Sequence, residues 1–321
     1  MMTAEVVSPR ASRREGMRSS PSSSRSAIRF FPLFTVNPIP PRQWMKGVTP
    51  YESITETPVR THLFSGMIII QKRKGRRSLR TPGRMGKYLP EPFPEQRIPE
   101  EGSLIEMERN REGLERYALL LASFNERARL TGPRDPAEIM GHIRDCAVSL
   151  VFAPDIGTVV DIGTGGGLPG IVWALCRPNL KITLLESVGK KCAILEEMAG
   201  MLRLSNVDVA CSRSEALSLE RRERYHIALS RAVGHLGVVA EYASPLLTVG
   251  GSACLFKGPR VLQELREIGD RWATLGFDDP VIHPYDLEGK SLCLVRLQKT
   301  GPCPARFPRN PGKANKSAWW R

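Results

Sequence analysis

The sequence of 321 residues predicts an α/β fold: a small N-terminal helical segment, then a mostly parallel sheet with an antiparallel last strand. From residue 158 onward, short apolar runs alternate with helical stretches or glycine-rich turns, which is typical of parallel strands joined by right-handed crossovers. The last two apolar runs are separated only by the letters DLEGK, and strands joined so closely are antiparallel. Amphipathic helical patterns precede the first apolar run.

The helical segment is expected to contain two helices. Apolar residues recur at spacings of three and four over residues 114–128, which predicts one amphipathic helix. A second helix is expected to begin at Pro136, because Asp135 can cap it and Glu138 follows three residues after the cap. Its apolar stripe continues over residues 139–150.

The strands of the parallel part are predicted at residues 158–162, 181–186, 207–211, 226–230 and 252–257. A helix over residues 261–275 follows, and the antiparallel strands are expected at residues 280–285 and 291–299. The remaining tail is rich in proline, lysine and arginine, so we expect an irregular backbone there.

Charge and composition divide the chain into four parts. Residues 1–100 are basic and of low complexity, which indicates disorder, a nucleic-acid arm, a start codon placed too early or, for residues 1–60, an organellar transit peptide. The helical segment is expected over 101–155, the α/β domain over 156–298 and a basic tail over 299–321. The net charge is +13 over 1–90, −5 over 91–297 and +6 over 298–321. RNA affinity would therefore need a local basic surface together with the tail.

Several classes of protein are disfavoured by the composition. The seven cysteines form no C-x-x-C pair and lie mostly in apolar runs, which is typical of reduced core residues. No apolar stretch reaches the roughly 18 residues that a membrane span needs. The five histidines are scattered without metal-ligand spacing. We therefore expect a cytoplasmic protein with no membrane or metal partner.

The stretch VVDIGTGGGLPGI, residues 159–171, is the strongest functional signal. Glycines after a strand let the backbone approach a ligand closely and direct a helix N-terminus at negative charge. The stretch contains the dinucleotide pattern G-x-G-x-x-G and also D-x-G-x-G-x-G, whereas the G-K-[ST] of a triphosphate loop is missing. Glu186 ends the next strand, where a carboxylate accepts ribose hydroxyls. A nicotinamide cofactor and a methyl donor both remain possible on these residues.

The D-x-G-x-G-x-G form resembles motif I of the class I S-adenosylmethionine-dependent methyltransferases, whose fold is Rossmann-like. The [DN]-P-P-[YF] turn of amine methylation is missing after the fourth strand, where Arg231 stands. Pro302-Cys303 matches the pair of carbon-5 pyrimidine methylation, but it lies in the tail and is interpreted as chance.

Beyond this loop, the chain resembles the bacterial 16S rRNA (guanine-N7)-methyltransferases over about residues 104–317. The matching segments are FNERARLT (124–131), HIRDC (142–146), DIGTGGGLPGI, LLESVGKKCAILEE, SRSEAL (212–217), LSRAVGHL (229–236), LLTVGGSACLFKG and PARFPRNPGKANKS. The resemblance implies S-adenosylmethionine as cofactor, and N7 of a guanine in the decoding region of 16S rRNA as acceptor. The small ribosomal subunit is the implied partner, and a monomer is expected.

Site residues follow from the loop, the strand ends and the resemblance. In the family, the positions of Gly163 and Leu168 contact the cofactor, those of Ser214 and Glu215 lie at its adenine end, and that of Arg231 is a binding arginine. The predicted cofactor-binding residues are Asp161, Gly163, Gly165, Gly167, Leu168, Glu186, Ser214, Glu215 and Arg231. The residues expected on the RNA side are Arg213, Arg231, Asn125 and His142, since arginine suits the acceptor edge of guanine and its phosphates.

The chain also departs from the family pattern. Phe124 replaces the usual tryptophan, Arg129 replaces an asparagine, and Cys146 ends the HIRDC segment where serine is usual. All three departures lie on the helical segment expected to face RNA, so they affect the substrate more than the cofactor.

No catalytic acid or base is predicted. Guanine N7 carries an in-plane lone pair and no proton, so the work of the enzyme is alignment and electrostatic fit. Two alternatives remain from other classes: an NAD-dependent oxidoreductase, and a non-catalytic RNA-binding protein on a methyltransferase fold.

Overall fold

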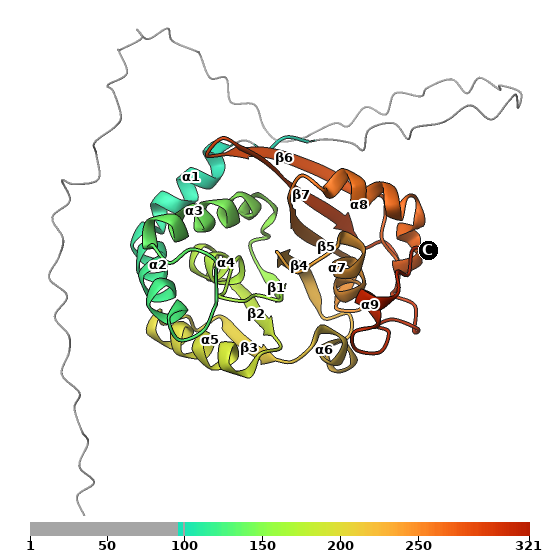
Figure 1. The fold of residues 1–321 in the computed structure, drawn as a ribbon, viewed down its shortest axis with the longest axis horizontal. Coiled ribbons are helices and arrows are strands. Elements are labelled where there is room, and N and C mark those ends of the chain that lie inside the picture. The colour runs from blue at the N-terminus through green and yellow to red at the C-terminus, as the bar shows by residue number, and fades with distance from the viewer. Residues whose placement is uncertain (1–95, 99) are drawn as a thin grey trace, which may run out of the picture. The chain divides into compact units, whose positions relative to one another are not determined.

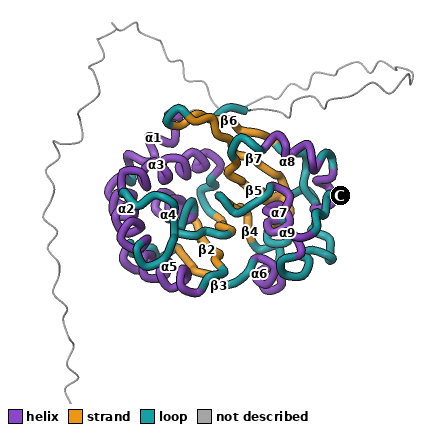
Figure 2. Tube along the Cα trace, viewed as in Figure 1, coloured by secondary structure: helices purple, strands orange, loops and turns teal. Residues whose placement is uncertain are grey.

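The structure is a computed structural model that describes residues 96–98 and 100–321 (Figure 1). The expectations for residues 1–95, namely disorder, a nucleic-acid arm, a misplaced start or a transit peptide, lie outside the described residues. In the described part, helices flank a central group of strands (Figure 2). None of these helices combines the length and apolar character that crossing a membrane requires.

The chain enters the sheet through a group of short helices: α1 (Glu100–Arg109), α2 (Arg111–Asn125), α3 (Pro136–Ala147) and the 3-10 helix η1 (Val148–Phe152). The predicted start of α3 is confirmed, because Asp135 accepts a hydrogen bond from the Ala137 amide (3.0 Å) and Pro136 is the first helical residue. Helix α1 was not predicted. Its half-exposed Leu104 and Ile105 leave little apolar periodicity to detect.

The sheet has seven strands in the order β3-β2-β1-β4-β5-β7-β6. The strands are β1 (Gly157–Ile162), β2 (Leu180–Glu186), β3 (Val207–Cys211), β4 (Tyr225–Arg231), β5 (Leu247–Lys257), β6 (Val281–Leu287) and β7 (Lys290–Gln298). Strands β1 to β5 pair in parallel, and β7 runs antiparallel between β5 and β6. The predicted α/β sheet with an antiparallel last strand is therefore confirmed.

Helices cover both faces of the sheet (Figure 1). The remaining helices are α4 (Gly170–Cys176), α5 (Gly189–Met201), α6 (Ser214–Glu220), α7 (Leu236–Ala243), α8 (Val261–Ile268), the 3-10 helix η2 (Arg271–Leu275) and α9 (Lys313–Lys316). Helices α2 to α5 share one buried cluster with Val159 of β1, and α7, α8 and the tail share another with Val160 and Ile162. Alternate side chains of one strand thus enter two cores, as expected for a sheet buried on both faces.

The prediction of a single helix over residues 261–275 is wrong. The helix ends at Ile268, Gly269 adopts φ +65°, and a separate 3-10 helix follows over Arg271–Leu275. Apolar periodicity continues across the break, because Trp272 and Leu275 are buried as well. A left-handed glycine, which no periodicity argument detects, ends α8.

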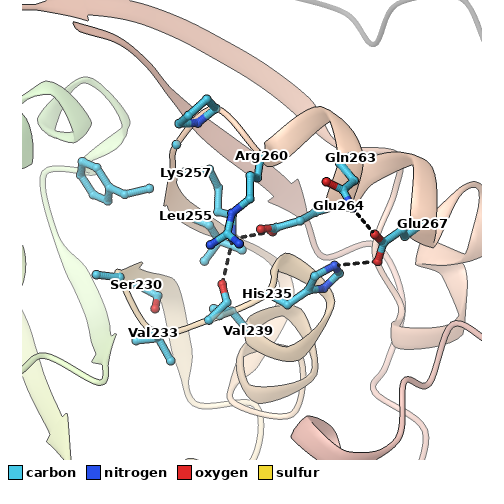
Figure 3. A pocket seen from close by; sticks show the side chains of 15 residues that line it. Ser230, Val233, His235, Val239, Leu255, Lys257, Arg260, Gln263, Glu264 and Glu267 are labelled. Carbon is cyan, nitrogen blue, oxygen red and sulfur yellow. Dashed lines mark hydrogen bonds and ion pairs between the residues drawn. The ribbon is translucent and has the colours of Figure 1, made fainter.

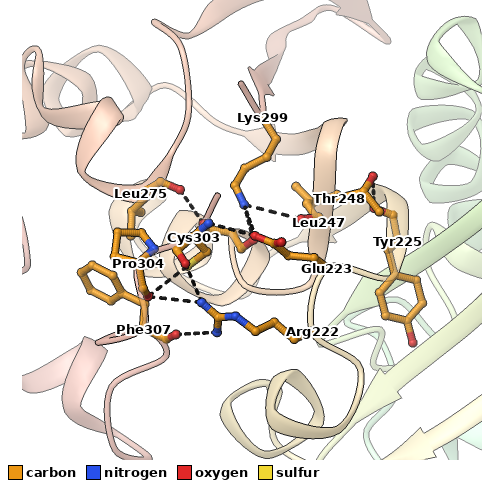
Figure 4. Close-up of polar contacts among 11 residues, drawn as sticks. Arg222, Glu223, Tyr225, Leu247, Thr248, Leu275, Lys299, Cys303, Pro304 and Phe307 are labelled. Carbon is orange, nitrogen blue, oxygen red and sulfur yellow. Dashed lines mark hydrogen bonds and ion pairs between the residues drawn. The ribbon is translucent and has the colours of Figure 1, made fainter. Parts of the chain in front are cut away.

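The segment after β7 is largely irregular, as expected, but it is packed against the domain (Figure 4). The fully buried Lys299 donates hydrogen bonds to the Ser244 carbonyl (2.9 Å) and to Glu223 (3.4 Å), and burial lowers its pKa. Arg222 donates to the carbonyls of Cys303 (2.6 Å) and Phe307 (2.7 Å). These contacts join the tail to the loop between α6 and β4.

Two tryptophans near position 320 contact the start of α7. Trp320 stacks on His235, with ring centroids 4.7 Å apart and planes within 7°. Trp319 donates its indole N–H to the Gly237 carbonyl (2.7 Å). The tail therefore supports the loop that connects β4 to α7.

Candidate functional site

The glycine loop between β1 and α4 has the backbone that its glycines allow. Gly163, Gly165 and Gly167 adopt φ values of +68°, +59° and +98°, which L side chains rarely adopt. A Cβ placed on Gly163 would lie only 2.5 Å from Cγ2 of Val233 in the β4–α7 loop. The backbone amides of Gly163 and Thr164 both donate to the Leu185 carbonyl (2.9 and 3.1 Å), which fixes the loop to β2.

Asp161 fixes this loop from beneath. Its Oδ2 accepts hydrogen bonds from the Thr164 hydroxyl (2.6 Å) and from the Gly170 amide at the start of α4 (2.8 Å). The side chain is fully buried, and burial raises the pKa of Asp161 to about 6, although its two hydrogen bonds oppose the shift. Asp161 does not line the adjoining cavity, so the structure gives it a role in shaping the loop.

Glu186 lies at the end of β2 and contacts the same loop. One carboxylate oxygen accepts from the amides of Ser187 (2.8 Å) and Val188 (3.0 Å), and the other accepts from the Gly165 amide (3.2 Å). A carboxylate offers about four acceptor positions, so these bonds leave capacity for one more donor.

A cavity of about 750 Å³ opens beyond the carboxyl ends of β1, β2 and β4. This volume lies within the roughly 300–1,000 Å³ typical of small-molecule sites. The structure brings together here the predicted residues Gly163, Gly165, Leu168, Glu186, His142 and Arg231. The cavity is also lined by Arg129, Lys191 and Lys257, so cationic side chains outnumber the carboxylates of Asp145 and Glu186. Such a surface suits an anionic ligand or RNA.

Arg231, at the end of β4, is held in place by two other elements. Its Nε donates to Asp145 Oδ2 on α3 (2.8 Å), and the hydroxyl of Tyr285 on β6 donates to Asp145 Oδ1 (2.6 Å). The Arg231 and Asp145 side chains are only 19% and 11% exposed, so the contact is largely desolvated. Because the contact uses Nε, the two Nη groups keep their protons for a ligand.

His142 also lines the cavity, but it does not bond Asp145 one turn away. Its Nδ1 lies 3.4 Å from the Thr131 hydroxyl instead. Burial and the positive charge of Arg231 lower the pKa of His142. The ring is therefore neutral near pH 7, where it can offer a hydrogen-bond donor and an acceptor.

Other predicted residues lie away from the cavity lining. Ser214 donates to the Tyr242 carbonyl (3.2 Å), and Glu215 accepts from the Gly312 amide (3.0 Å) in the tail. Asn125 bonds the backbone at Leu130, Thr131 and Pro133, so its side chain holds the loop before α3. Gly167 and the N-cap residue Arg213 are not among the lining residues either.

Sequence reasoning missed several residues of this site. Asp145 and Tyr285 complete the Arg231 network, and Lys191 lines the cavity although its sequence context indicates a solvated helix start. Asp145 carried a signal, because a charged residue at a buried position of an amphipathic helix usually has a partner. Tyr285 carried none, since an aromatic residue in a strand is ordinary core.

The fold and the site together define a class of enzyme. A sheet in the order β3-β2-β1-β4-β5-β7-β6, with a glycine loop after β1 and a carboxylate ending β2, is that of the class I methyltransferases. The family model GidB, rRNA small subunit methyltransferase G, matches residues 110–292. The chain belongs to this family, which removes the ground for an oxidoreductase.

Curated relatives agree with this assignment. The rRNA small subunit methyltransferase G of Rubrobacter xylanophilus is 42% identical over 210 residues, covering 62% of this chain and 80% of the relative. The Carboxydothermus hydrogenoformans protein of the same name is 38% identical over 205 residues, with coverages of 62% and 87%. The crystal structure of M. jannaschii TYW2 with AdoMet is 15% identical, with a TM-score of 0.39 and coverages of 49% and 74%. A likeness this weak carries no part of the assignment.

Proposed function

We propose that this chain transfers the methyl group of S-adenosylmethionine to N7 of a guanine in the decoding region of 16S rRNA. One observation carries the proposal. In a member of the rRNA small subunit methyltransferase G family, the glycine loop, Glu186 and Arg231 surround one cavity at the carboxyl ends of β1, β2 and β4.

The residues around the cavity fit this cofactor. Gly163 lines the cavity and has no side chain, so its backbone can lie directly against a ligand. Glu186 keeps acceptor capacity for a ribose hydroxyl. Arg231 presents two Nη groups that suit a carboxylate or phosphate. We propose that Leu168 contacts the cofactor as well, and that Ser214 and Glu215 lie at its adenine end.

The proposed reaction does not require general acid or base catalysis by the protein. Bound S-adenosylmethionine supplies an electrophilic methyl group, and guanine N7 supplies a lone pair without a proton to remove. The chain's own residues bind and orient both partners, and the cationic lining attracts the RNA backbone. The proposal therefore needs neither a general base nor a metal, and it places the enzyme in the cytoplasm as a monomer.

The test is methyl transfer by the full chain from labelled S-adenosylmethionine to intact small subunits and to naked 16S rRNA. Label is expected in one of the two substrates, and chain cleavage at N7-methylguanine is expected to map it to one decoding-region guanine. Absence of label from both would refute the proposal and favour a non-catalytic RNA-binding protein. Label at another atom or base would refute the N7 assignment alone.

A further inference from the structure

A second cavity of about 560 Å³ adjoins the first and opens between the β4–α7 loop, the end of β5 and α8 (Figure 3). Both cavities are lined by Ala232, Phe256, Lys257 and Gly258. None of the residues predicted from the sequence lines the second cavity. A methyl acceptor has to lie beside the bound methyl donor, and the second cavity adjoins the one proposed for that donor.

A largely buried ion pair forms part of the wall of this cavity. Lys257 Nζ lies 2.6 Å from Glu264 Oε2 and donates to the Gly234 carbonyl (2.8 Å). The same Oε2 accepts from the Leu236 amide (2.7 Å). The side chains are only 10% and 14% exposed, and burying both charges costs free energy that their attraction need not repay. A purely structural contact would be served as well by apolar residues.

The pair keeps unused hydrogen-bonding capacity. Among the described residues, Lys257 Nζ uses two of its three donor positions, and the hydrogen bonds of Glu264 all involve Oε2. One ammonium proton of Lys257 and Oε1 of Glu264 are therefore left as a donor and an acceptor on two groups in contact. Figure 3 shows Glu264, labelled on α8, close to Lys257 at the end of β5, with their contact as a dashed line.

This arrangement matches one edge of guanine. Guanine presents O6, an acceptor, next to N1–H, a donor, whereas adenine presents the reverse order of groups at the same positions. We propose that the second cavity binds the acceptor base, with Lys257 donating to O6 and Glu264 accepting from N1–H. This inference rests on the proposed function and names the residues that select guanine.

The rest of the cavity suits a base in this orientation. Val239, Leu255 and Phe256 are buried and give apolar surface for the faces of a purine. N7 is bonded to C5, the ring carbon next to the one that bears O6, and it lies on the opposite side of O6 from N1–H. Because Lys257 lines both cavities, a contact from Lys257 to O6 places N7 on the cofactor side.

The test compares Glu264→Gln with a matched control, Glu223→Gln. A glutamine at 264 can keep the Leu236 hydrogen bond through its carbonyl oxygen while removing the negative charge. Glu223 pairs with the buried Lys299 and lines neither cavity. Losing a hydrogen bond to a charged acceptor is expected to lower kcat/KM for small subunits by about 10- to 100-fold, while the Kd for S-adenosylmethionine stays within about twofold.

The control is expected to keep wild-type kcat/KM per folded molecule. Wild-type transfer by Glu264→Gln would overturn the inference and leave the proposed function standing. A wild-type chain that transfers no methyl group would instead refute the proposed function, and with it the inference.

A second measurement does not depend on a variant that folds. Saturation-transfer NMR of wild-type protein with S-adenosylhomocysteine is expected to show contact with guanosine 5′-monophosphate well above that with adenosine 5′-monophosphate. Equal contact with both nucleotides, or with neither, would overturn the inference.

Discussion

Replacing Gly163 by alanine is expected to weaken cofactor binding through a defined collision. The new Cβ would lie 2.5 Å from Val233 Cγ2, whereas carbon atoms in contact are normally about 3.5–4.0 Å apart. The Val233 side chain, or the β4–α7 loop that carries it, must therefore move by about 1 Å, and a displacement of that size can cost about 100-fold in rate in a site that works by positioning. The left-handed φ of +68° adds about 1–2 kcal/mol of instability.

A second substitution separates the two effects. The Cβ of Val233 would lie 3.7 Å from the new Cβ, an ordinary contact, so Val233→Ala removes the collision and keeps the backbone strain. The double variant is expected to regain the affinity of Val233→Ala for S-adenosylmethionine while remaining less stable than wild type by about 1–2 kcal/mol.

Calorimetric titration with S-adenosylmethionine measures the affinities, and thermal unfolding measures the stabilities, of wild type, the two single variants and the double variant. Wild-type affinity in Gly163→Ala would show that the loop does not contact the cofactor. A double variant as weak as Gly163→Ala would show that the collision with Val233 is not the cause.

Three further predictions follow from contacts described above. Because burial raises the pKa of Asp161 from 3.8 to about 6, its ionisation destabilises the fold as pH rises. Asp161→Asn should therefore gain about 2 kcal/mol in free energy of unfolding relative to wild type between pH 4.5 and 7.5 in urea titrations; a pH-independent difference would contradict this. Tyr285→Phe removes the 2.6 Å hydrogen bond to Asp145 and is expected to cost about 1 kcal/mol in urea unfolding and to raise KM more than it lowers kcat; an unchanged KM would contradict this. Replacing the exposed Lys313 and Lys316 by glutamine should flatten the salt dependence of RNA binding by a slope of up to about 1.5, with cofactor affinity unchanged; an unaltered slope would rule out the tail as an RNA contact.

RNA binding by the tail is best tested with point substitutions, because deletion of the tail would do more than remove positive charge. The sequence indicates a basic segment available to RNA, but Lys299 is buried against Glu223, and Arg309 is bound to Glu241 (2.6 Å). Composition counts these cations without showing which of them are already paired. Deletion of residues 299–321 would also leave the carboxylates of Glu223 and Glu241 without these partners.

Sequence patterns were sufficient to predict features that depend on residues close together in the sequence. Apolar runs located the strands, and the side chain of Asp135 capped the helix that its position predicted. The glycine loop and Glu186 meet because they lie at the carboxyl ends of the adjacent parallel strands β1 and β2.

Sequence patterns did not predict contacts between polar side chains that lie far apart in the sequence. Asp145 meets Arg231 and Tyr285, which come from two other elements far along the sequence. The pair of Lys257 and Glu264 also escaped notice, since a lysine ending a strand and a glutamate on a helix are ordinary surface residues in a sequence. Only the packing of α8 against the β4–α7 loop makes them a largely buried pair.

His235 lines the second cavity and stacks on Trp320. This part of the cavity wall is therefore supported by a residue that is synthesised much later than the wall. A polypeptide cut or terminated between β7 and Trp320 would still carry the glycine loop, Glu186 and Arg231. It would lack the support beneath the β4–α7 loop. Motif content is therefore a poor guide to activity in fragments of this chain, and proteolysis in the tail can act on the acceptor side without touching a single residue of the cofactor motif.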